Sequence, residues 1–410
     1  MGSMISLGVG RMEIDWGKNN SFRDHSSLFR LEDVKNIPYY YAGGDGELVI
    51  EENEGYTRKL SSVKNRLDML GYTLEKVEKY YNEALEEFAD FGFEVNLSFA
   101  AFSDLLRNID VNRINTPEYA VEYDENGYDL GEFVRRCIIP EKEIYARLLA
   151  AVSGNKNHLN HNLETFFENI DPYLVLRLLA ENPSCTELDV YWNFADVVEG
   201  GWTSREDIVK PLTDGQKVLI VTEGSSDSFI LKKTIGELYP DISDFFRFID
   251  MEENYPFTGT GNLYNFCCGL MKIGIVGNIM VVFDNDTAGN EKYEKLMELP
   301  QIEGLLITKL PDSDVFNSFN TVGPQGVSVE NINGTAVAIE CFLDFASCKK
   351  IPTVRWTNYI DKAQKYQGAL LDKDIYVRTF KKANLREGTY DTTKLKMLIE
   401  YLLEQWYTYH

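Results

Sequence analysis

Two apolar runs in the second half of this 410-residue chain each end in acidic residues, and this pairing constrains the fold more than any other feature. The first run, Lys217–Val221, leads into Thr222-Glu223-Gly224. The second run, Ile279–Phe283, leads into Asp284-Asn285-Asp286. A strand that is apolar at every position is typical of a parallel sheet whose two faces are both covered by helices. The two runs therefore predict two buried parallel strands with carboxylates at their carboxyl ends.

Segments of helical character separate these runs from two further strands. Helices are expected over 225–238, 261–273 and 289–298, and strands at Phe246–Asp250 and Leu305–Lys309. This alternation predicts a Rossmann-like α/β domain with a mostly parallel sheet and helices on both faces. In such sheets ligands bind beyond the carboxyl ends of the strands. Both acidic segments are expected at that edge, which makes it the candidate functional site.

The first half of the chain follows a different pattern. Residues 1–50 alternate in short strands and turns, with one turn at Gly43–Gly46, and from Ser61 to about Ala89 the apolar residues recur at helical spacing. Further helices are expected at 98–109, 132–152, 163–181 and 187–199. The pattern predicts a mainly helical N-terminal domain with a short β segment at its start.

A break in the pattern marks the boundary between the two halves. Gly200-Gly201-Trp202 interrupts the helical segments, and Pro211 to Gly215 has the composition of a turn. We therefore expect two domains, 1–205 and 206–410.

The formal net charge of −24 restricts how this chain could bind a nucleic acid. A protein that binds nucleic acid by itself usually presents a basic face, because neutralisation of phosphates supplies most of the affinity. Here a basic patch must be local, a metal must offset the acidic residues, or a partner must supply the contacts. The charge counts against simple free-standing binding and does not exclude an enzyme.

Cysteine usage and hydropathy suggest a cytoplasmic protein. None of the six cysteines forms a Cys-x-x-Cys pair and only four histidines are present, so a zinc site is not expected. No run of about 18 apolar residues occurs, and no basic segment followed by an apolar core marks a secretory signal. We expect reduced thiols, a cytoplasmic location and no association with a membrane.

The acidic residues have the composition of a magnesium or manganese site. Asp284 and Asp286 are alternate residues, so their side chains share a face on an extended segment. Together with Glu223 they would form a cluster of carboxylates, which repel one another unless a cation compensates. Carboxylate oxygens suit Mg²⁺ or Mn²⁺ and not zinc. Asp227, early in the following helix, adds a fourth carboxylate.

The segments Glu223-Gly224-Ser225-Ser226-Asp227 and Asp284-Asn285-Asp286-Thr287-Ala288-Gly289 together resemble the Toprim superfamily, which includes nucleases of the overcoming-lysogenization-defect (OLD) type. The resemblance covers a core of about 215–345. It implies that Glu223 ligates metal or acts as general acid/base, and that Asp284 and Asp286 hold the metal. It also implies that Asp227 supports a second metal or orients the ligands.

OLD-like members carry a further acidic residue and a late lysine. The resemblance implies Glu340 as the additional ligand, with an ordinary helix carboxylate as the alternative. Lys373 would stabilise charge at the transition state, with a solvated surface lysine as the alternative.

The N-terminal half resembles the HEPN/Toprim N-terminal domain family. The likeness lies in Ser6–Asn19 and extends into Leu60–Leu67 and Leu70–Leu74. The HEPN ribonuclease signature, an arginine and a histidine separated by four to six residues, is not matched by any histidine of the chain. No catalytic role is therefore expected here, and the half is interpreted as a scaffold, a sensor or an oligomerisation module.

Together these features predict a metal-dependent nuclease that hydrolyses phosphodiester bonds of DNA or RNA, with Mg²⁺ or Mn²⁺ as cofactor. The resemblance places it among anti-phage defence effectors, with a protein partner or regulator and an open possibility of a homo-oligomer. The alternative is a non-catalytic subunit of a defence complex that binds nucleic acid or protein and keeps a structural or vestigial metal site.

Overall fold

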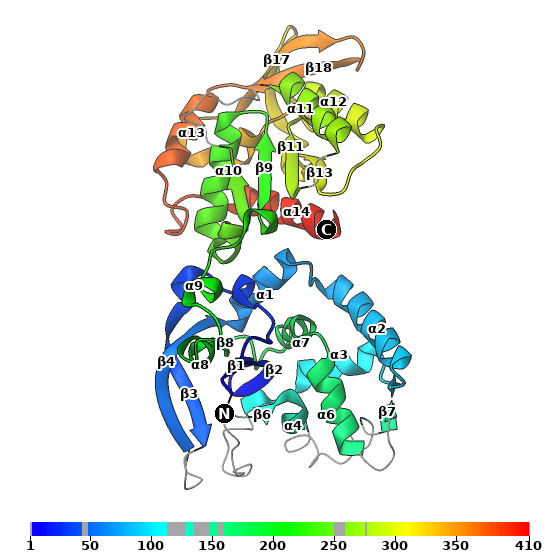
Figure 1. The fold of residues 1–410 in the computed structure, drawn as a ribbon. Helices are drawn as coiled ribbons and strands as arrows, with labels where there is room; N and C mark the ends of the chain where they lie inside the picture. The colour runs from blue at the N-terminus through cyan, green and yellow to red at the C-terminus, as the bar shows by residue number, and fades with distance from the viewer. Residues whose placement is uncertain are drawn as a thin grey trace. The chain divides into compact units, whose positions relative to one another are not determined.

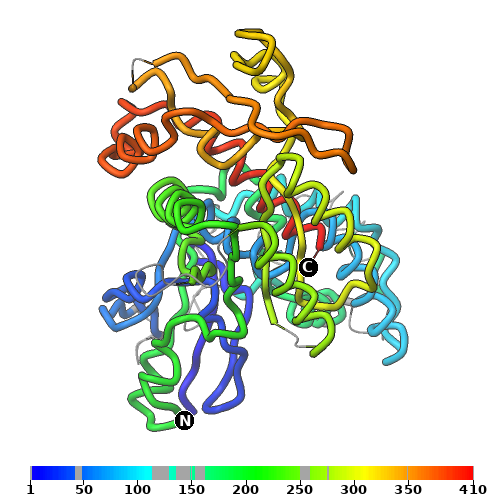
Figure 2. Tube along the Cα trace, turned by 90° about the horizontal axis from the view of Figure 1, so that it is seen from above, coloured from blue at the N-terminus to red at the C-terminus, as the bar shows by residue number. Residues whose placement is uncertain are grey.

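The chain divides into two compact units, each described by itself below (Figures 1 and 2). Unit 1 is Met1–Leu212 and unit 2 is Thr213–His410. The expected turn at Gly43–Gly46 and most of the expected helix at 132–152 lie outside the described residues. The computed structural model describes residues 2–42, 48–112, 128–134, 148, 150–153, 159–249, 259–274, 277–348 and 350–409.

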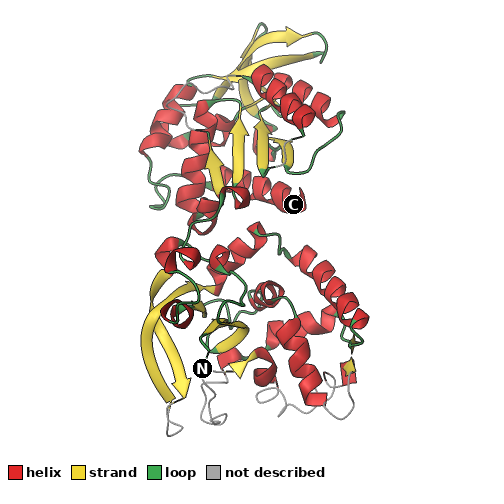
Figure 3. Cartoon of the chain, viewed as in Figure 1, coloured by secondary structure: helices red, strands yellow, loops and turns green. Residues whose placement is uncertain are grey.

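Unit 1 is built on a six-stranded, mostly antiparallel sheet among its described residues (Figure 3). Only the pairing of β2 with β6 is parallel. The prediction of a mainly helical domain with a short β segment is therefore wrong, because this sheet extends well beyond the first residues. In spatial order the strands are β3 (Val34–Ala42), β4 (Leu48–Lys59), β8 (Asp189–Asn193), β1 (Met4–Val9), β2 (Met12–Lys18) and β6 (Tyr128–Asp129).

Strand β8 overturns the helix expected at 187–199. It pairs antiparallel with both β1 and β4, and only Ala195–Glu199 (α8) is helical. Val190 and Trp192 are buried in the main core, whereas Tyr191 and Asn193 alternate to the other face. The segment is a strand because its partners are distant in the sequence, and local spacing does not reveal such pairing.

Helices α1, α2 and α3 of unit 1 pack against α7, whose residues are all buried (Figure 1). A helix that is apolar on every side fits only an interior position. Asp171 caps it by accepting from the Tyr173 N–H at 2.8 Å, and Pro172 occupies its first turn. Its one charged residue, Arg177, donates to Asp68 at 2.7 Å. The described helices of the unit are α1 (Leu60–Met69), α2 (Leu74–Asp90), α3 (Phe99–Asn108), α4 (Leu130–Phe133), α6 (Leu159–Asn169), α7 (Pro172–Leu179), α8 (Ala195–Glu199) and α9 (Arg205–Ile208).

Unit 2 contains the parallel sheet that the apolar runs predict. Its four strands pair in parallel in the order β10, β9, β11, β13. Val221, Val281 and Phe283 are fully buried between the covering helices. The predicted strands and helices are confirmed, with bounds β9 (Val218–Thr222), α10 (Ser225–Leu238), β10 (Phe246–Phe248), α11 (Thr260–Ile273), β11 (Ile279–Phe283), α12 (Thr287–Met297) and β13 (Leu305–Lys309).

The direction of the chain reverses between β9 and β11. From β9 it crosses to β10 on one side, and from β11 it crosses to β13 on the other. Right-handed crossovers then place α10 on one face and α11 and α12 on the opposite face. In agreement, α11 packs on α12, whereas α10 packs on the last helix, α14 (Thr393–Tyr409). A ligand crevice is expected at this switch point, beyond the carboxyl ends of β9 and β11.

A second sheet and short elements complete unit 2. The hairpin of β17 and β18 lies beside α12, and β18 is the strand in contact with that helix (Figure 2). Among the described residues, no helix of either unit is both long and apolar enough to cross a bilayer. The remaining strands and helices are β5 (Glu94–Val95) and β7 (Val152–Ser153) in unit 1, and β12 (Asn285–Asp286), β14 (Phe319–Gly323), β15 (Gly326–Glu330), β16 (Ala336–Val337), η9 (Ile339–Phe342), β17 (Thr353–Ile360), β18 (Lys365–Leu370) and α13 (Lys373–Lys382) in unit 2.

Glu13 on β2 gives unit 1 a dependence of stability on pH. Burial raises the pKa of this carboxyl to about 8, against a bond to Ser6 that lowers it, and the charges of Asp129, Asp15 and Glu168 add to the rise. Between the unfolded pKa near 4.5 and the folded value, the folded state holds a proton that the unfolded state has released. The free energy of unfolding must therefore fall as the pH rises, by about 1.4 kcal/mol per pH unit for this group.

We expect Glu13→Gln to remove that fall. The difference in unfolding free energy between Glu13→Gln and the wild-type chain should grow by a few kcal/mol between pH 5 and pH 8. Urea unfolding followed by circular dichroism across this range measures it. A constant difference at all pH values would show that Glu13 is ionised in the folded state.

Candidate metal centre

Glu223, the residue after β9, joins three segments at the carboxyl edge of the parallel sheet. Its Oε1 accepts a hydrogen bond from the backbone N–H of Asp284 at 3.0 Å. Its Oε2 accepts from the Thr260 hydroxyl at 2.6 Å, and its carbonyl oxygen accepts from the Gly259 N–H at 2.9 Å. The side chain therefore connects the end of β9 to the end of β11 and to the start of α11.

Asp227 and Glu340 come to this edge from different elements. Asp227 lies in the first turn of α10 and Glu340 lies in η9, and both are buried. The hydroxyl of Ser226 lies 3.2 Å from Asp227 Oδ1 and 3.4 Å from Glu340 Oε1. Lys373, at the start of α13, brings its Nζ to 3.8 Å from Glu340 Oε1 while its side chain stays 59% exposed.

Asp286 caps α12 while it faces the same cluster. Its Oδ1 accepts from the Gly289 N–H at 2.7 Å, and its Oδ2 accepts from the Gln367 amide on β18. Gln367 also accepts from the Ala288 N–H at 3.0 Å. Gly289 is required, since a Cβ there would lie 2.2 Å from the carbonyl oxygen of Asp284. The turn after β11 is therefore held by a contact from the start of α12 and by a contact from β18.

The carboxylates of this cluster resist ionisation together. Burial raises the pKa of Asp284 well above its usual range, and the charges of Asp227, Glu223, Asp286 and Glu340 raise it further. Burial also raises the pKa of Asp227 to about 7, with contributions from Glu340 and Glu223. For Glu223 and Asp286 the rise through burial is opposed by the hydrogen bonds that they accept. The cluster is therefore short of positive charge.

The structure brings all the residues singled out in the sequence to one place. Two residues that donate hydrogen bonds to these carboxylates, Thr260 and Gln367, were not predicted from the sequence. Thr260 follows a glycine with a positive φ of 87° at the start of α11, a weak signal for a loop that approaches another group. Gln367 lies 81 residues from Asp286 in the chain, and nothing in its local sequence indicates the contact. The six predicted residues are Glu223, Asp227, Asp284, Asp286, Glu340 and Lys373.

The donor set fits a hard divalent cation, because it consists of buried carboxylates with a deficit of positive charge. The side chains are not assembled around such an ion as they stand. Within the described part of the chain, no three Asp, Glu, His or Cys side chains converge closely enough to hold a metal. Glu223 and Asp286 instead direct their oxygens to hydrogen-bond donors. Ligation would require these carboxylates to move closer together.

Comparison with known proteins concerns unit 1. A family model described as HEPN/Toprim N-terminal domain 1 matches residues 1–216, just over half of the chain. This match confirms the N-terminal resemblance. It ends before Glu223, so the Toprim resemblance of unit 2 lies outside it. No curated protein and no solved structure matches the chain.

We expect Asp284→Asn to stabilise the metal-free protein. Because the folded-state pKa of Asp284 is raised, ionisation of this carboxyl costs stability once the pH exceeds its unfolded value of 3.8. In EDTA at pH 8 the variant should melt a few degrees above the wild-type chain. The gain should shrink toward pH 4, where the unfolded state is protonated as well. Thermal unfolding measures it, with Asp361→Asn at an exposed turn as control. A lower melting temperature at pH 8 would contradict the electrostatic account.

Proposed function

The chain belongs to the HEPN/Toprim N-terminal domain 1 family, and from that premise we propose that it is a metal-dependent nuclease whose unit 2 carries a Toprim-type acidic centre. Its substrate is DNA or RNA and its reaction is hydrolysis of phosphodiester bonds. The family name, which joins this N-terminal domain to Toprim, supports the pairing of the two units. The proposal includes a role as an effector of anti-phage defence.

One observation carries the proposal. Carboxylates from the end of β9, α10, the β11 turn and η9 gather at the switch point of a parallel sheet. Burial raises the pKa values of Glu223, Asp227, Asp284 and Asp286, and neighbouring carboxylates add to the rise at the first three. A purely structural cluster would be expected to include enough cations to balance its charge. Among the described residues, the one ion pair that these carboxylates make is the 3.8 Å contact of an exposed lysine, Lys373, with Glu340. Strongly perturbed groups in such a crevice favour a functional site.

The proposed metal is Mg²⁺ or Mn²⁺, held by the five acidic residues. When bound, such an ion lowers the pKa of an attacking water and stabilises the charge on the leaving oxygen. Asp284 and Asp286 would be the principal ligands, with Glu340 as an additional ligand and Asp227 to support a second metal or orient the ligands. These residues are the ones whose mutual repulsion a divalent cation would relieve.

The side chains themselves supply position and proton transfer. Burial raises the pKa of Glu223, opposed by the hydrogen bonds from Thr260 and from the Asp284 N–H, and a carboxylate of raised pKa is a stronger general base when it is ionised. Gln367 holds the Asp286 carboxylate against the start of α12. Lys373, exposed and next to Glu340, would stabilise the negative charge that develops on the phosphate.

A specific observation favours the second candidate, a non-catalytic subunit that binds nucleic acid or protein. No metal-ligating group is preassembled among the described residues, and the net charge of −24 opposes binding of a polyanion without help. The same charge supports a protein partner or regulator for the nuclease. Metal-dependent cleavage separates the two candidates.

We expect the purified protein to cut nucleic acid in Mg²⁺ or Mn²⁺ and not in EDTA. Labelled plasmid, single-stranded DNA and total RNA would each be incubated with the wild-type chain and with Asp284→Ala. Asp284→Ala should reduce cleavage by about 100-fold or more, because it removes a ligand and not merely a supporting contact. Asp361→Ala, on the exposed β17–β18 turn, is the matched control and should cut normally.

If no substrate is cut, calorimetric titration with Mn²⁺ distinguishes a nuclease that requires a partner from the non-catalytic subunit. Binding of Mn²⁺ that disappears in Asp284→Ala would support a nuclease that requires a partner. No Mn²⁺ binding to the wild-type chain would sink the proposed metal centre and leave the second candidate.

The variant Gln367→Leu tests separately whether the Gln367 amide positions Asp286 as a metal ligand. Loss of the amide should weaken Mn²⁺ affinity or cleavage by about 10- to 100-fold, the usual effect of removing a group that orients a ligand. Raising the Mn²⁺ concentration should restore cleavage, whereas it should not restore Asp284→Ala. Wild-type metal affinity in Gln367→Leu would mean that Asp286 is not a ligand.

A further inference from the structure

The hairpin of β17 and β18 in unit 2 carries three aromatic rings side by side (Figure 1). Tyr359 and Tyr366 are cross-strand partners, and their ring centroids are 5.0 Å apart. Trp356 continues the series, with its ring centroid 6.3 Å from that of Tyr366. The two tyrosines are 48% and 45% exposed, and the tryptophan is half-buried. These three residues are called the aromatic row below.

A β-bulge brings Trp356 and Tyr359 to one face of the hairpin. Alternate residues of a strand share a face, so two residues that are three apart normally point in opposite directions. Here the register shifts between Trp356 and Asn358, and Thr357 is the extra residue. The extra residue returns Tyr359 to the side of Trp356. The aromatic row therefore depends on an irregularity of the strand, because regular pairing would separate its rings.

The indole of Trp356 lies across the sheet. A Cβ at Gly323 on β14 would lie 2.9 Å from its Cδ1, and a Cβ at Gly368 on β18 would lie 2.9 Å from its Cζ3. Side chains at these two positions would displace the ring. Its N–H also donates to Glu330 on β15. The ring is therefore held in place by groups on three strands.

The hairpin is basic, although the chain as a whole carries a charge of −24. Residues 353–370 include three cations, Arg355, Lys362 and Lys365, and one carboxylate, Asp361, in the turn. All three cations are exposed, and none forms an ion pair with another residue that the structure describes. Lys365 lies on β18, the edge strand of its sheet. This is a local basic patch of the kind that so acidic a chain requires in order to bind a polyanion.

The aromatic row is attached to the turn that carries Asp286. The carbonyl oxygen of Tyr366 accepts from the hydroxyl of Thr287, the residue after Asp286, at 2.7 Å. Gln367, the residue after Tyr366, donates to Asp286 itself. A strand bound along the row would therefore pass beside the acidic centre.

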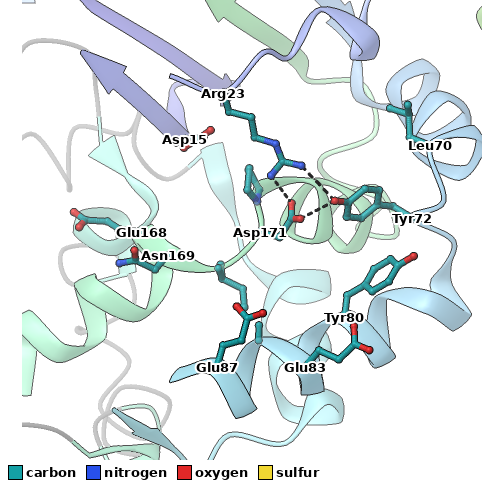
Figure 4. Close-up of a pocket in the computed structure, with 13 residues that line it drawn as sticks. Asp15, Arg23, Leu70, Tyr72, Tyr80, Glu83, Glu87, Glu168, Asn169 and Asp171 are labelled. Atoms are coloured by element: carbon teal, nitrogen blue, oxygen red, sulfur yellow. Dashed lines mark hydrogen bonds and ion pairs between the residues drawn. The ribbon is translucent and has the colours of Figure 1, made fainter. Parts of the chain in front are cut away.

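Two tyrosines of unit 1 lie in the opposite electrostatic setting (Figure 4). Tyr72 and Tyr80 line a cavity of about 640 Å³ together with five acidic residues. Among the described residues that line it, the one cation is Arg23, which is paired with Asp171 at 3.0 Å. Carboxylates repel phosphates, so rings in this setting do not suit a nucleic acid. The hairpin combines exposed rings with cations that have no such partner.

We propose that the aromatic row binds a single strand of nucleic acid and holds it beside the acidic centre, an inference whose second part rests on the proposed nuclease. Aromatic rings stack bases of any sequence, and neighbouring cations contact the phosphates. The planes of Trp356 and Tyr366 are inclined by 45°, and those of Tyr359 and Tyr366 by 69°. Bases that are splayed apart in a single strand can stack on such rings one by one, whereas duplex bases are covered by their neighbours.

The first test measures binding without metal, so that it does not depend on cleavage. Fluorescence anisotropy in EDTA at low salt compares labelled oligo-thymidylate and oligo-uridylate with a duplex of the same length. A single strand should bind at least about tenfold more tightly than the duplex. Tyr359→Ala should weaken that binding by about tenfold, whereas Tyr359→Phe, which keeps the ring, should bind as the wild-type chain does. Phe91→Ala removes an 88% exposed ring of unit 1 and is the matched control.

The variant Lys365→Gln separates phosphate contacts from stacking. It should reduce the slope of log affinity against log salt concentration by about 0.7, the value for one phosphate contact on a single strand. Tyr359→Ala should lower the affinity and leave this slope unchanged, because stacking releases no counterion. An affinity that depends on Lys365 and not on Tyr359 would overturn the aromatic row as a binding site for bases.

Metal binding and cleavage are measured on the same variants. Tyr359→Ala should bind Mn²⁺ as the wild-type chain does, because Tyr359 is not among the proposed ligands. Single-strand binding by a wild-type chain that binds no Mn²⁺ and cuts nothing would confirm the binding role and refute the nuclease. Metal-dependent cleavage with unchanged strand binding in Tyr359→Ala would refute the aromatic row and keep the nuclease. Equal affinity for duplex and single strand, or no binding of any oligonucleotide, also overturns the proposal.

Discussion

The hydrogen bond from the Asp284 N–H to Glu223 Oε1 fixes the edge of the parallel sheet on which the rest of unit 2 depends. It joins the ends of two adjacent strands where the chain reverses its direction across the sheet. Thr260 and Gly259 attach the start of α11 to the same residue. The Glu223 carboxylate thus ties the ends of β9 and β11, already paired along their backbones, to the start of α11.

The hydrogen bonds divide the cluster into two kinds of carboxylate. Glu223 and Asp286 accept bonds from donors that partly offset their burial. Asp227 has weaker compensation and a pKa near 7, and Asp284 is raised well above its usual range by burial and four neighbouring charges. The deficit of positive charge is therefore concentrated at Asp284 and Asp227. A divalent cation bound at this site would relieve the repulsion between these two carboxylates.

Local sequence pattern predicts the parts of the structure in which neighbouring residues decide the fold. Strands β9 and β11 are apolar at nearly every position because both faces are covered, and their acidic ends follow directly. It failed at β8, where Asp189–Asn193 is a strand only because β1 and β4 lie on either side. The role of Gln367 was likewise not predictable from the sequence, since its contact with Asp286 depends on how β18 packs beside α12. Non-local contacts, not propensity, account for these failures.

Two buried arginines of unit 1 are paired with acceptors from other segments of the chain. Arg177 on α7 bonds to Asp68 on α1 and to Glu181, and Arg66 on α1 donates to the carbonyl oxygen of Ser27 at 2.9 Å. A buried charge is stable only when such partners are present. The interior of unit 1, like the acidic edge of unit 2, therefore depends on pairings between distant segments that local sequence pattern does not reveal.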